Sequence, residues 1–185
     1  MIGLGNPGSE YEQTRHNAGF WFVDELARQY HSEFRSESKF SGFVSKPNVA
    51  GQDVWLLKPN TFMNLSGQAA QAIMNFYKIP VEEILVVHDE LDLEPGIVRL
   101  KQGGGHGGHN GLRDLIQKLG SKEFRRLRVG IGHPGNKHQV TDYVLKRASK
   151  EDIQKIEEGL DSALGIVPLL LKDEFEKAMN ELHSK

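Results

Sequence analysis

The spacing of apolar residues along the chain predicts a series of helices. In residues 20–30 the apolar positions recur three or four places apart, at Phe20, Val23 and Ala27, which is the period of one helix face. The same period predicts four further helices, over residues 67–77, 110–119, 149–164 and 175–182. Because proline lacks an amide hydrogen, we expect Pro168 to kink the helix or to start a new one between the last two predicted helices.

Short runs of β-forming residues, bounded by turn signals, predict strands between these helices. Residues 84–88 read Ile-Leu-Val-Val-His, a run typical of a strand that is buried on both faces. Residues 43–45 and 54–58 lie on either side of a turn that contains Gly51, and they read as two more strands. Further strands are expected at residues 1–5, 97–101 and 127–131.

The alternation of strands and helices indicates an α/β fold. It favours a central mixed, largely parallel twisted sheet flanked by helices. The 185 residues contain no internal repeat and no linker, and this length suits one domain with a sizeable core. We therefore expect residues 1–185 to form a single domain that includes the C-terminal helices at about residues 149–183.

Composition excludes several classes of protein. A hydrophobic content of 38% and a charged content of 26% are ordinary for a globular chain. No apolar run is long enough to span a bilayer, and the sequence enters a glycine-containing turn without a secretory leader. Cysteine is absent, which removes disulfides and thiolate nucleophiles. We expect a cytoplasmic protein with no membrane partner.

Charge is distributed unevenly along the chain. The segment from Arg99 to Arg128 holds eight basic residues and two acidic ones, although the whole chain has a net charge of −2. A run of charges most often forms only a solvated face. Here the basic residues flank a glycine-rich segment, and this favours a local patch that binds a polyanion.

That segment, residues 103–111, reads Gly-Gly-Gly-His-Gly-Gly-His-Asn-Gly. Glycine costs backbone entropy on folding, so six glycines in nine positions need a reason. A flexible linker is the alternative, but linkers are usually rich in serine and lack embedded imidazoles. An apolar helical pattern also follows at once. The segment therefore predicts a loop that lies against a ligand.

Polar residues gather where the predicted strands end. Besides the glycine loop, these clusters are residues 6–8, 11–17, 60–67 and 88–92. In α/β sheets, ligands bind where strands end and loops begin. We therefore expect all five segments to meet in one crevice.

His16 and Asp89 are the candidates for proton transfer. His16 lies in a polar loop just ahead of a helix, and an ordinary imidazole pKa of about 6.5 lets it act as a base near neutrality. Asp89 follows the buried strand, and a carboxylate there can hold a histidine in one tautomer and raise its basicity. A capping or surface role is the plain alternative for a lone histidine.

A metal site is the competing interpretation of the histidines. Enough ligand atoms are present, on His88, Asp89, Asp92, His106 and His109. However, neither H-x-x-x-H nor H-E-x-x-H spacing occurs. We expect no metal.

A dinucleotide cofactor is also disfavoured, although Gly3, Gly5 and Gly8 match G-x-G-x-x-G. That fingerprint needs a full strand before it and a helix directly after it. Only two residues precede Gly3, and Pro7 lies inside the turn. We expect no cofactor and a tight turn that exposes Asn6.

Uncharged amides complete the set of candidate groups. An amide both donates and accepts hydrogen bonds, so Asn64 and Asn110 suit a peptide bond or a developing oxyanion. Helix capping is the better account of Asn60. Ser66 lacks the G-x-S-x-G elbow of a nucleophile and also reads as a cap. Together these residues predict a hydrolase that activates water and acts on a substrate with a phosphate-rich portion.

At these residues the sequence resembles the bacterial peptidyl-tRNA hydrolases. The matching motifs recur in the family's order at residues 3–8, 11–19, 58–67, 88–93, 103–112 and 126–132. The resemblance implies hydrolysis of the ester between a peptide and the terminal ribose of tRNA, which recycles tRNA for translation. It further implies a monomer that needs neither metal nor cofactor.

The resemblance also implies roles for individual residues. His16 corresponds to the general base that activates water, Asp89 to its supporting carboxylate, and Asn6 to a sensor of the peptide portion. The residues that would line the substrate crevice are Tyr11, Phe62, Met63, Asn64 and Asn110. Lys101 and Arg128 match the basic pair that grips the phosphate at the tRNA end.

Two features qualify this resemblance. The family has a few more residues before its first glycine, so either this sequence starts late or the first strand is short. The acidic C-terminal third resembles the family only in its helical character.

Two other functions stay open. One is a non-enzymatic RNA-binding protein on the same fold, similar to relatives in chloroplast intron splicing, and the other is a metal-dependent hydrolase. The presence of His16, Asp89 and the amides favours the esterase.

Overall fold

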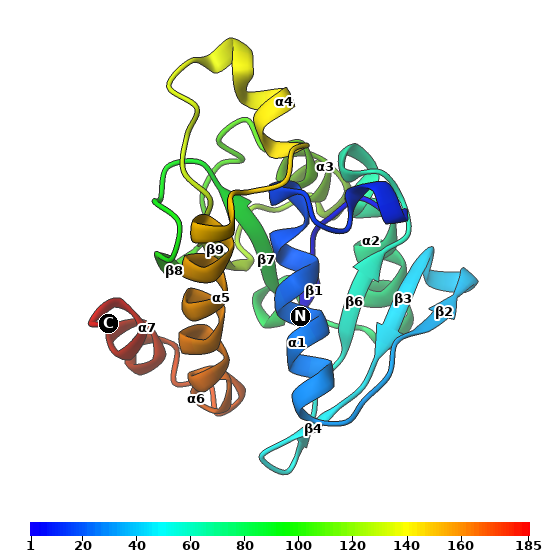
Figure 1. The fold of residues 1–185 in the computed structure, drawn as a ribbon. Helices are drawn as coiled ribbons and strands as arrows, with labels where there is room; N and C mark the ends of the chain where they lie inside the picture. Colours follow the sequence, from blue (N-terminus) through cyan, green and yellow to red (C-terminus); the bar gives the residue numbers. More distant parts are fainter.

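The computed structural model describes residues 1–185, and its centre is a seven-stranded twisted sheet in the order β2-β3-β6-β1-β7-β9-β8 (Figure 1). The parallel centre consists of β1 (Ile2–Gly3), β6 (Leu56–Pro59), β7 (Leu85–Glu90) and β9 (Arg125–Gly130). The antiparallel additions are β2 (Arg35–Glu37), β3 (Gly42–Ser45) and β8 (Val98–Gln102). A small hairpin, β4 (Asn48–Val49) and β5 (Gln52–Asp53), turns at Gly51.

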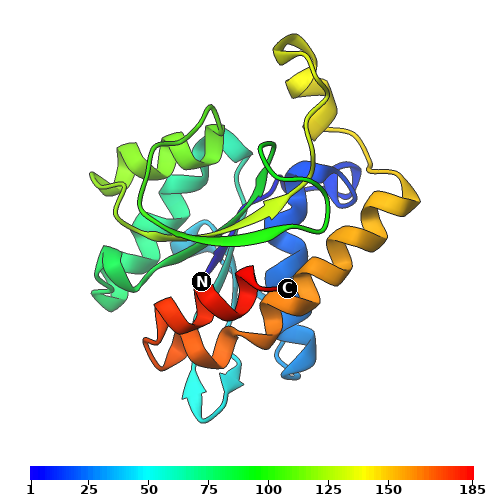
Figure 2. The same ribbon diagram turned by 90° about the vertical axis from the view of Figure 1, so that its left-hand side faces the viewer.

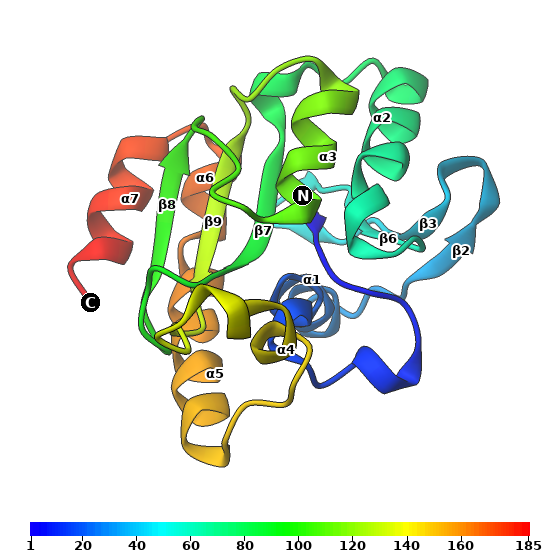
Figure 3. The same ribbon diagram turned by 90° about the horizontal axis from the view of Figure 1, so that it is seen from above.

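Helices cover both faces of this sheet (Figures 2 and 3). One face packs against α1 (Ala18–Gln29), α5 (Lys150–Gly165), α6 (Val167–Leu171) and α7 (Phe175–His183). The other face packs against α2 (Ser66–Tyr77) and α3 (Asn110–Leu119). A short helix, α4 (Val140–Val144), stands out from the body next to the start of α1. None of the helices combines the length and apolar character that a bilayer crossing requires.

Strand β7 lies between two hydrophobic cores. Val87 belongs to the core beneath α1 and α5, whereas Val86 belongs to the core beneath α2 and α3, and neither is exposed. Successive side chains of a strand point to opposite faces, so a strand covered on both sides needs a continuous apolar run. The predictions of a doubly buried strand here and of an α/β fold with a mixed sheet are confirmed.

The predicted helices are also present, with small shifts at their ends. Ser149 precedes α5 as its N-cap, and its Oγ accepts a hydrogen bond from the Asp152 amide at 3.1 Å, as serine commonly does at a helix start. Pro168 lies in the first turn of a new helix, α6, so the predicted restart is confirmed. The first strand, β1, spans two residues.

The apolar pattern missed β2, α4 and the two short strands of the β4–β5 hairpin. Strand β2 reads Arg-Ser-Glu and forms one edge of the sheet, where no face is buried deeply enough to demand apolar residues. The opposite edge strand, β8, is covered by α7. His183 Nε2 of α7 accepts a hydrogen bond from the Leu100 amide of β8 at 3.0 Å.

Helix α1 lies unusually close to the strands beneath it. A Cβ atom added at Gly19 would lie 2.3 Å from the Val87 carbonyl oxygen and 2.5 Å from the Leu4 amide nitrogen. Only glycine permits this approach. The contact holds the segment just before α1, which carries His16, over the carboxyl ends of β1 and β7.

We predict that Gly19→Ala destabilises the protein although alanine is the better helix former by about 1 kcal/mol. The clash with strand backbone should lower the free energy of unfolding by about 2 kcal/mol or more, measured by denaturant titration. Gly165→Ala is the matched control, because a Cβ at Gly165 meets nothing within 4 Å. Equal stability of the two variants would contradict the close helix–sheet contact.

Candidate active site

A cleft of about 820 Å³ opens where β1, β7 and β9 end. All five polar segments identified in the sequence contribute to its lining, so their predicted convergence is confirmed. Helix α4 adds an apolar wall through Val140 and Val144. Of the predicted site residues, the following line the cleft: Asn6, His16, Phe62, Met63, Asn64, Asp89, Lys101, Asn110 and Arg128. Tyr11 does not, but its ring meets Phe62 edge-on, with 6.1 Å between centroids.

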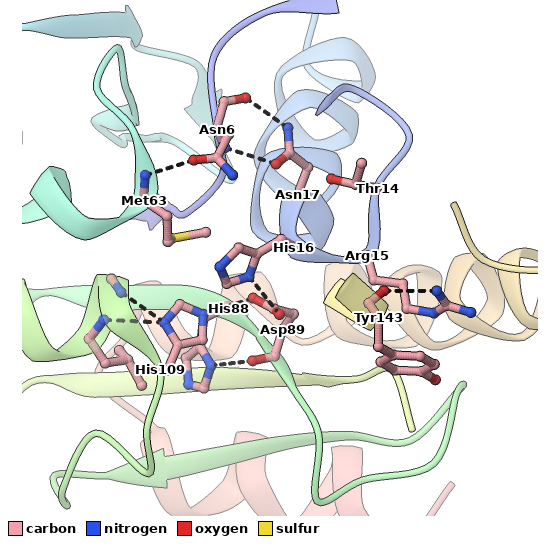
Figure 4. A network of polar contacts seen from close by, with 12 residues as sticks. Asn6, Thr14, Arg15, His16, Asn17, Met63, His88, Asp89, His109 and Tyr143 are labelled. Carbon is pink, nitrogen blue, oxygen red and sulfur yellow. Dashed lines mark hydrogen bonds and ion pairs between the residues drawn. The ribbon is translucent and has the colours of Figure 1, made fainter. Parts of the chain in front are cut away.

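At the base of the cleft, the Asp89 carboxylate lies between two imidazoles (Figure 4). His16 Nδ1 is 2.9 Å from Asp89 Oδ2, and His109 Nε2 is 2.8 Å from Asp89 Oδ1. The side chain of Asp89 is 2% exposed. His16 Nδ1 donates to the carboxylate, and His16 Nε2 has no partner within the protein. This nitrogen is therefore available to a molecule in the cleft.

The contact between His16 and Asp89 raises the pKa of the imidazole and lowers the pKa of the carboxylate. Burial alone would lower the pKa of His16, but the charge and hydrogen bond of Asp89 outweigh it and raise that pKa above its ordinary value. Burial would likewise raise the pKa of Asp89, but His16 and His109 outweigh it and hold that pKa well below its usual range. Asp89 is therefore an ionised carboxylate at neutral pH.

His88, the third imidazole at this base, is neutral. Its Nδ1 donates to the Asp89 carbonyl oxygen at 2.8 Å, and its ring meets that of His109 at a centroid distance of 5.2 Å. Complete burial, together with the neighbouring His109, lowers the pKa of His88 to about 4. The ring therefore adds no positive charge to the cleft at neutral pH.

A second buried network fixes Asn6 (Figure 4). The Asn17 side chain binds the backbone of Asn6 twice: Oδ1 accepts from the Asn6 amide at 2.8 Å, and Nδ2 donates to the Asn6 carbonyl at 3.0 Å. The Asn6 side-chain Oδ1 accepts from the Met63 amide at 2.7 Å. Because its Oδ1 points at the Met63 amide, the Asn6 side chain is left with its NH2 group as a donor without a partner in the protein.

Arg126 shapes the glycine loop from strand β9. Its guanidinium donates to the carbonyl oxygens of Gly104 and Gly105, and to that of Lys122 at 3.2 Å. Gly104 has a φ of 111°, a conformation that side-chain-bearing residues rarely adopt. The glycine loop forms a wall of the cleft, and Arg126 holds its shape.

The basic rim is partly neutralised by an acid. Arg128 Nε donates to Glu90 Oε1 at 2.8 Å, whereas Lys101 is exposed and makes no ion pair. The two predicted cations thus differ: the Arg128 guanidinium has an acidic partner, and the Lys101 ammonium has none within the protein.

Two smaller expectations were wrong. Asn60 does not cap a helix, because Phe62 and Leu65 occupy the cap positions of the two helical segments that follow it. Ser66 begins α2, and its Oγ donates to the Met63 carbonyl at 2.7 Å rather than capping the helix. The buried hydroxyl of Ser66 is thereby excluded as a nucleophile.

The His16, Asp89 and His109 side chains form the one cluster that could ligate a metal ion, with their ligand atoms within 4.8 Å of one another. In this structure the same atoms satisfy one another through hydrogen bonds. Each of these candidate ligand atoms therefore has a hydrogen-bond partner within the cluster.

The fold and this site define the class of protein: an α/β domain whose cleft holds a buried His–Asp pair beside a basic rim. The peptidyl-tRNA hydrolase family profile matches residues 1–185. A peptidyl-tRNA hydrolase from Ruthia magnifica subsp. Calyptogena magnifica is 54% identical over 185 residues, which cover all of this chain and 97% of the relative. One from Marinomonas sp. (strain MWYL1) is 56% identical, covering all of this chain and 95% of the relative.

The solved structures agree. The crystal structure of peptidyl-tRNA hydrolase from Acinetobacter baumannii superposes with a TM-score of 0.96 at 50% identity, covering 98% of this chain and 92% of that one. The chain belongs to the peptidyl-tRNA hydrolase family.

We predict that Asn17→Asp destabilises the protein. An aspartate cannot donate to the Asn6 carbonyl, and its charge would be buried against that oxygen, so the free energy of unfolding should fall by about 1–3 kcal/mol. Denaturant titration measures the change. Asn60→Asp is the control, because Asn60 is exposed and its side chain has no partner. Equal stability of the two variants would show that the Asn17 contacts do not hold Asn6.

Proposed function

We propose that this protein hydrolyses the ester between the peptide and the terminal ribose of peptidyl-tRNA, with His16 as the general base. One observation carries the proposal: His16 is bound at Nδ1 by a buried carboxylate, and its Nε2 remains free in the cleft. This arrangement fixes the tautomer and orientation that a base needs. The family membership of the whole chain supports the same reaction.

In the proposed mechanism, His16 Nε2 takes a proton from a water molecule while the water oxygen attacks the ester carbonyl carbon. Asp89 stabilises the imidazolium that forms. The tetrahedral intermediate then collapses, the bond to the ribose oxygen breaks, and that oxygen receives the proton from His16. The products are a peptide with a free carboxyl group and a tRNA with a free ribose hydroxyl. The ester is already activated, so no metal or cofactor enters the proposal.

Asn6 is proposed to distinguish peptidyl from aminoacyl esters. A peptide presents a carbonyl acceptor near its ester, whereas a free amino acid presents an ammonium group. Asn6 offers only a donor, because the Met63 amide occupies its Oδ1. Two donors cannot satisfy each other, and a buried polar group left unpaired costs binding energy. This pattern favours substrates with a blocked amine.

Asn64 and Asn110 are proposed to hold the remaining amides or the developing oxyanion. Asn110 Oδ1 faces Arg113 Nη1 at 3.3 Å, which leaves its Nδ2 as a donor. Asn64 is exposed and makes no side-chain hydrogen bond within the protein. Phe62 and Met63, with Tyr11 packed behind Phe62, offer apolar surface to the substrate.

Lys101 and Arg128 are proposed to bind the phosphate at the tRNA end. Backbone phosphates give affinity that does not depend on base sequence, so one enzyme could act on many tRNAs. We further propose that the protein acts in the cytoplasm as a monomer, since one chain supplies every group of the proposed site. Light scattering on the purified protein tests the monomer.

We predict that His16→Ala lowers hydrolysis of an N-blocked aminoacyl-tRNA by a factor of roughly 10²–10⁴, because the general base is lost. Binding of tRNA should change little. The assay compares wild type and variant with a chelator present. Wild-type protein that binds tRNA without turnover would favour the RNA-binding alternative. Activity lost with the chelator would favour the metal-dependent hydrolase, and near-normal turnover of the variant would refute the base.

We predict that Lys101→Ala weakens kcat/KM selectively for tRNA substrates. The slope of log(kcat/KM) against log salt should flatten by about 1, since one phosphate contact is lost. Lys46→Ala is the control, because Lys46 lies in the chain that leads to the β4–β5 hairpin, at the other end of the sheet (Figure 1). Equal loss on a blocked ester that lacks the tRNA body would contradict a phosphate contact.

A further inference from the structure

Asp89 binds two imidazoles, and the proposed mechanism uses only one of them. His16 contacts Oδ2. His109, which belongs to the glycine loop, contacts Oδ1 with its Nε2 atom at 2.8 Å. The His109 side chain is 9% exposed and that of His16 is 11% exposed, so the two contacts are equally buried. An ordered, buried imidazole on the catalytic carboxylate needs an explanation of its own.

The other nitrogen of His109 settles its protonation. His109 is the N-cap of α3, and its Nδ1 accepts from the Gly111 amide at 3.1 Å and the Leu112 amide at 3.3 Å. A nitrogen that accepts hydrogen bonds carries no proton. Nε2 is therefore the nitrogen that carries a proton and donates it to Asp89. A second proton on Nδ1 would point at two backbone N–H groups and break the cap.

We propose that His109 is a positioning residue that clamps the Asp89 carboxylate and ties it to the first turn of α3. The inference rests on the proposed function, because it assigns His109 to the same reaction. The clamp fixes the plane of the carboxylate so that Oδ2 faces His16. It also links that carboxylate to Asn110, the first residue of α3. The position of the His16 ring relative to the Asn110 side chain is thereby fixed.

The clamp also controls how strongly Asp89 holds the proton of His16. A carboxylate that accepts a hydrogen bond on Oδ1 has less negative charge to offer at Oδ2. Without His109, Asp89 should attract the imidazolium of His16 more strongly and keep it protonated to higher pH. His109 thus limits how far Asp89 raises the pKa of His16.

Few other titratable groups act on His16. Strand β7 contributes Asp89 and, behind the His109 ring, the neutral His88. From α4, the Tyr143 hydroxyl donates to the Ile131 carbonyl, and on the same turn as His16 the Arg15 guanidinium stacks over the Tyr143 ring at 3.8 Å. The first turn of α1 carries no acidic residue. His109 therefore acts on His16 through the shared Asp89 carboxylate and through direct ring contact, with 5.0 Å between the two ring centroids.

The chain allows the two roles of His109 to be separated. In His109→Asn the side-chain oxygen can still accept from the helix amides, because asparagine is among the best N-caps, but it is too short to reach Asp89. In His109→Ala both contacts are lost. His106→Asn is the matched control: His106 is on the same loop, and its Nδ1 accepts only from the Gly108 amide at 2.9 Å.

The test is an NMR titration of the His16 ring in wild type and the three variants, which needs no turnover. We expect His109→Asn to keep nearly wild-type stability and to move the His16 midpoint to higher pH, and His106→Asn to leave that midpoint in place. In the esterase assay, kcat of His109→Asn should fall roughly tenfold, as when a histidine loses an orienting partner. The acidic limb of its pH profile should follow the shifted midpoint.

A folded His109→Asn variant with an unshifted His16 midpoint would overturn the inference, whatever its turnover. An activity loss in His109→Ala that His109→Asn fully restores would also overturn it, because the cap alone would then explain the effect. If the wild type shows no esterase activity, the proposed function fails, while the titration still reports whether His109 shifts the pKa of His16.

Discussion

The burial of one ionised carboxylate is the constraint on which this molecule's site depends. An unpaired carboxylate in so enclosed a place would be very costly, so Asp89 must receive donors from more than one side. It does so from His16, which precedes α1, and from His109, which precedes α3. These two helices pack on opposite faces of the sheet, and the carboxylate at the end of β7 is where their first turns meet.

Much of the fold could be predicted because it follows from local apolar periodicity. The continuous apolar run of β7 requires cover on both faces, and Pro168 requires a break between helices. The convergence of the polar segments could also be predicted, since strand ends of a parallel sheet share one edge. Strand β2 was missed because its three residues bury no apolar surface.

The supporting partners of the site could not be predicted in the same way. His109 and Asn17 act through hydrogen bonds across 20 and 11 residues of sequence, and the Arg128–Glu90 pair spans 38. No spacing rule connects such positions, because the distance is set only when α3 and β9 pack beside β7. The two histidines among the glycines of residues 103–111 were a signal, but they indicated a ligand as readily as a contact with Asp89. Asn60 and Ser66 are of residue types that cap helices, but the position of a cap depends on where the helix starts. The helical segments here start after Phe62 and Leu65.

The two borders of the sheet are protected by different means. On one border, strand β2 carries the charged residues Arg35 and Glu37. On the other, α7 covers β8, and the His183 imidazole accepts a hydrogen bond from the Leu100 amide. Burial and the nearby cations Arg99 and Arg128 lower the pKa of His183, so this nitrogen stays an acceptor at neutral pH. Open borders invite strands of other chains. The last helix of the chain thus guards the molecule against edge-to-edge aggregation, a task independent of any chemistry in the cleft.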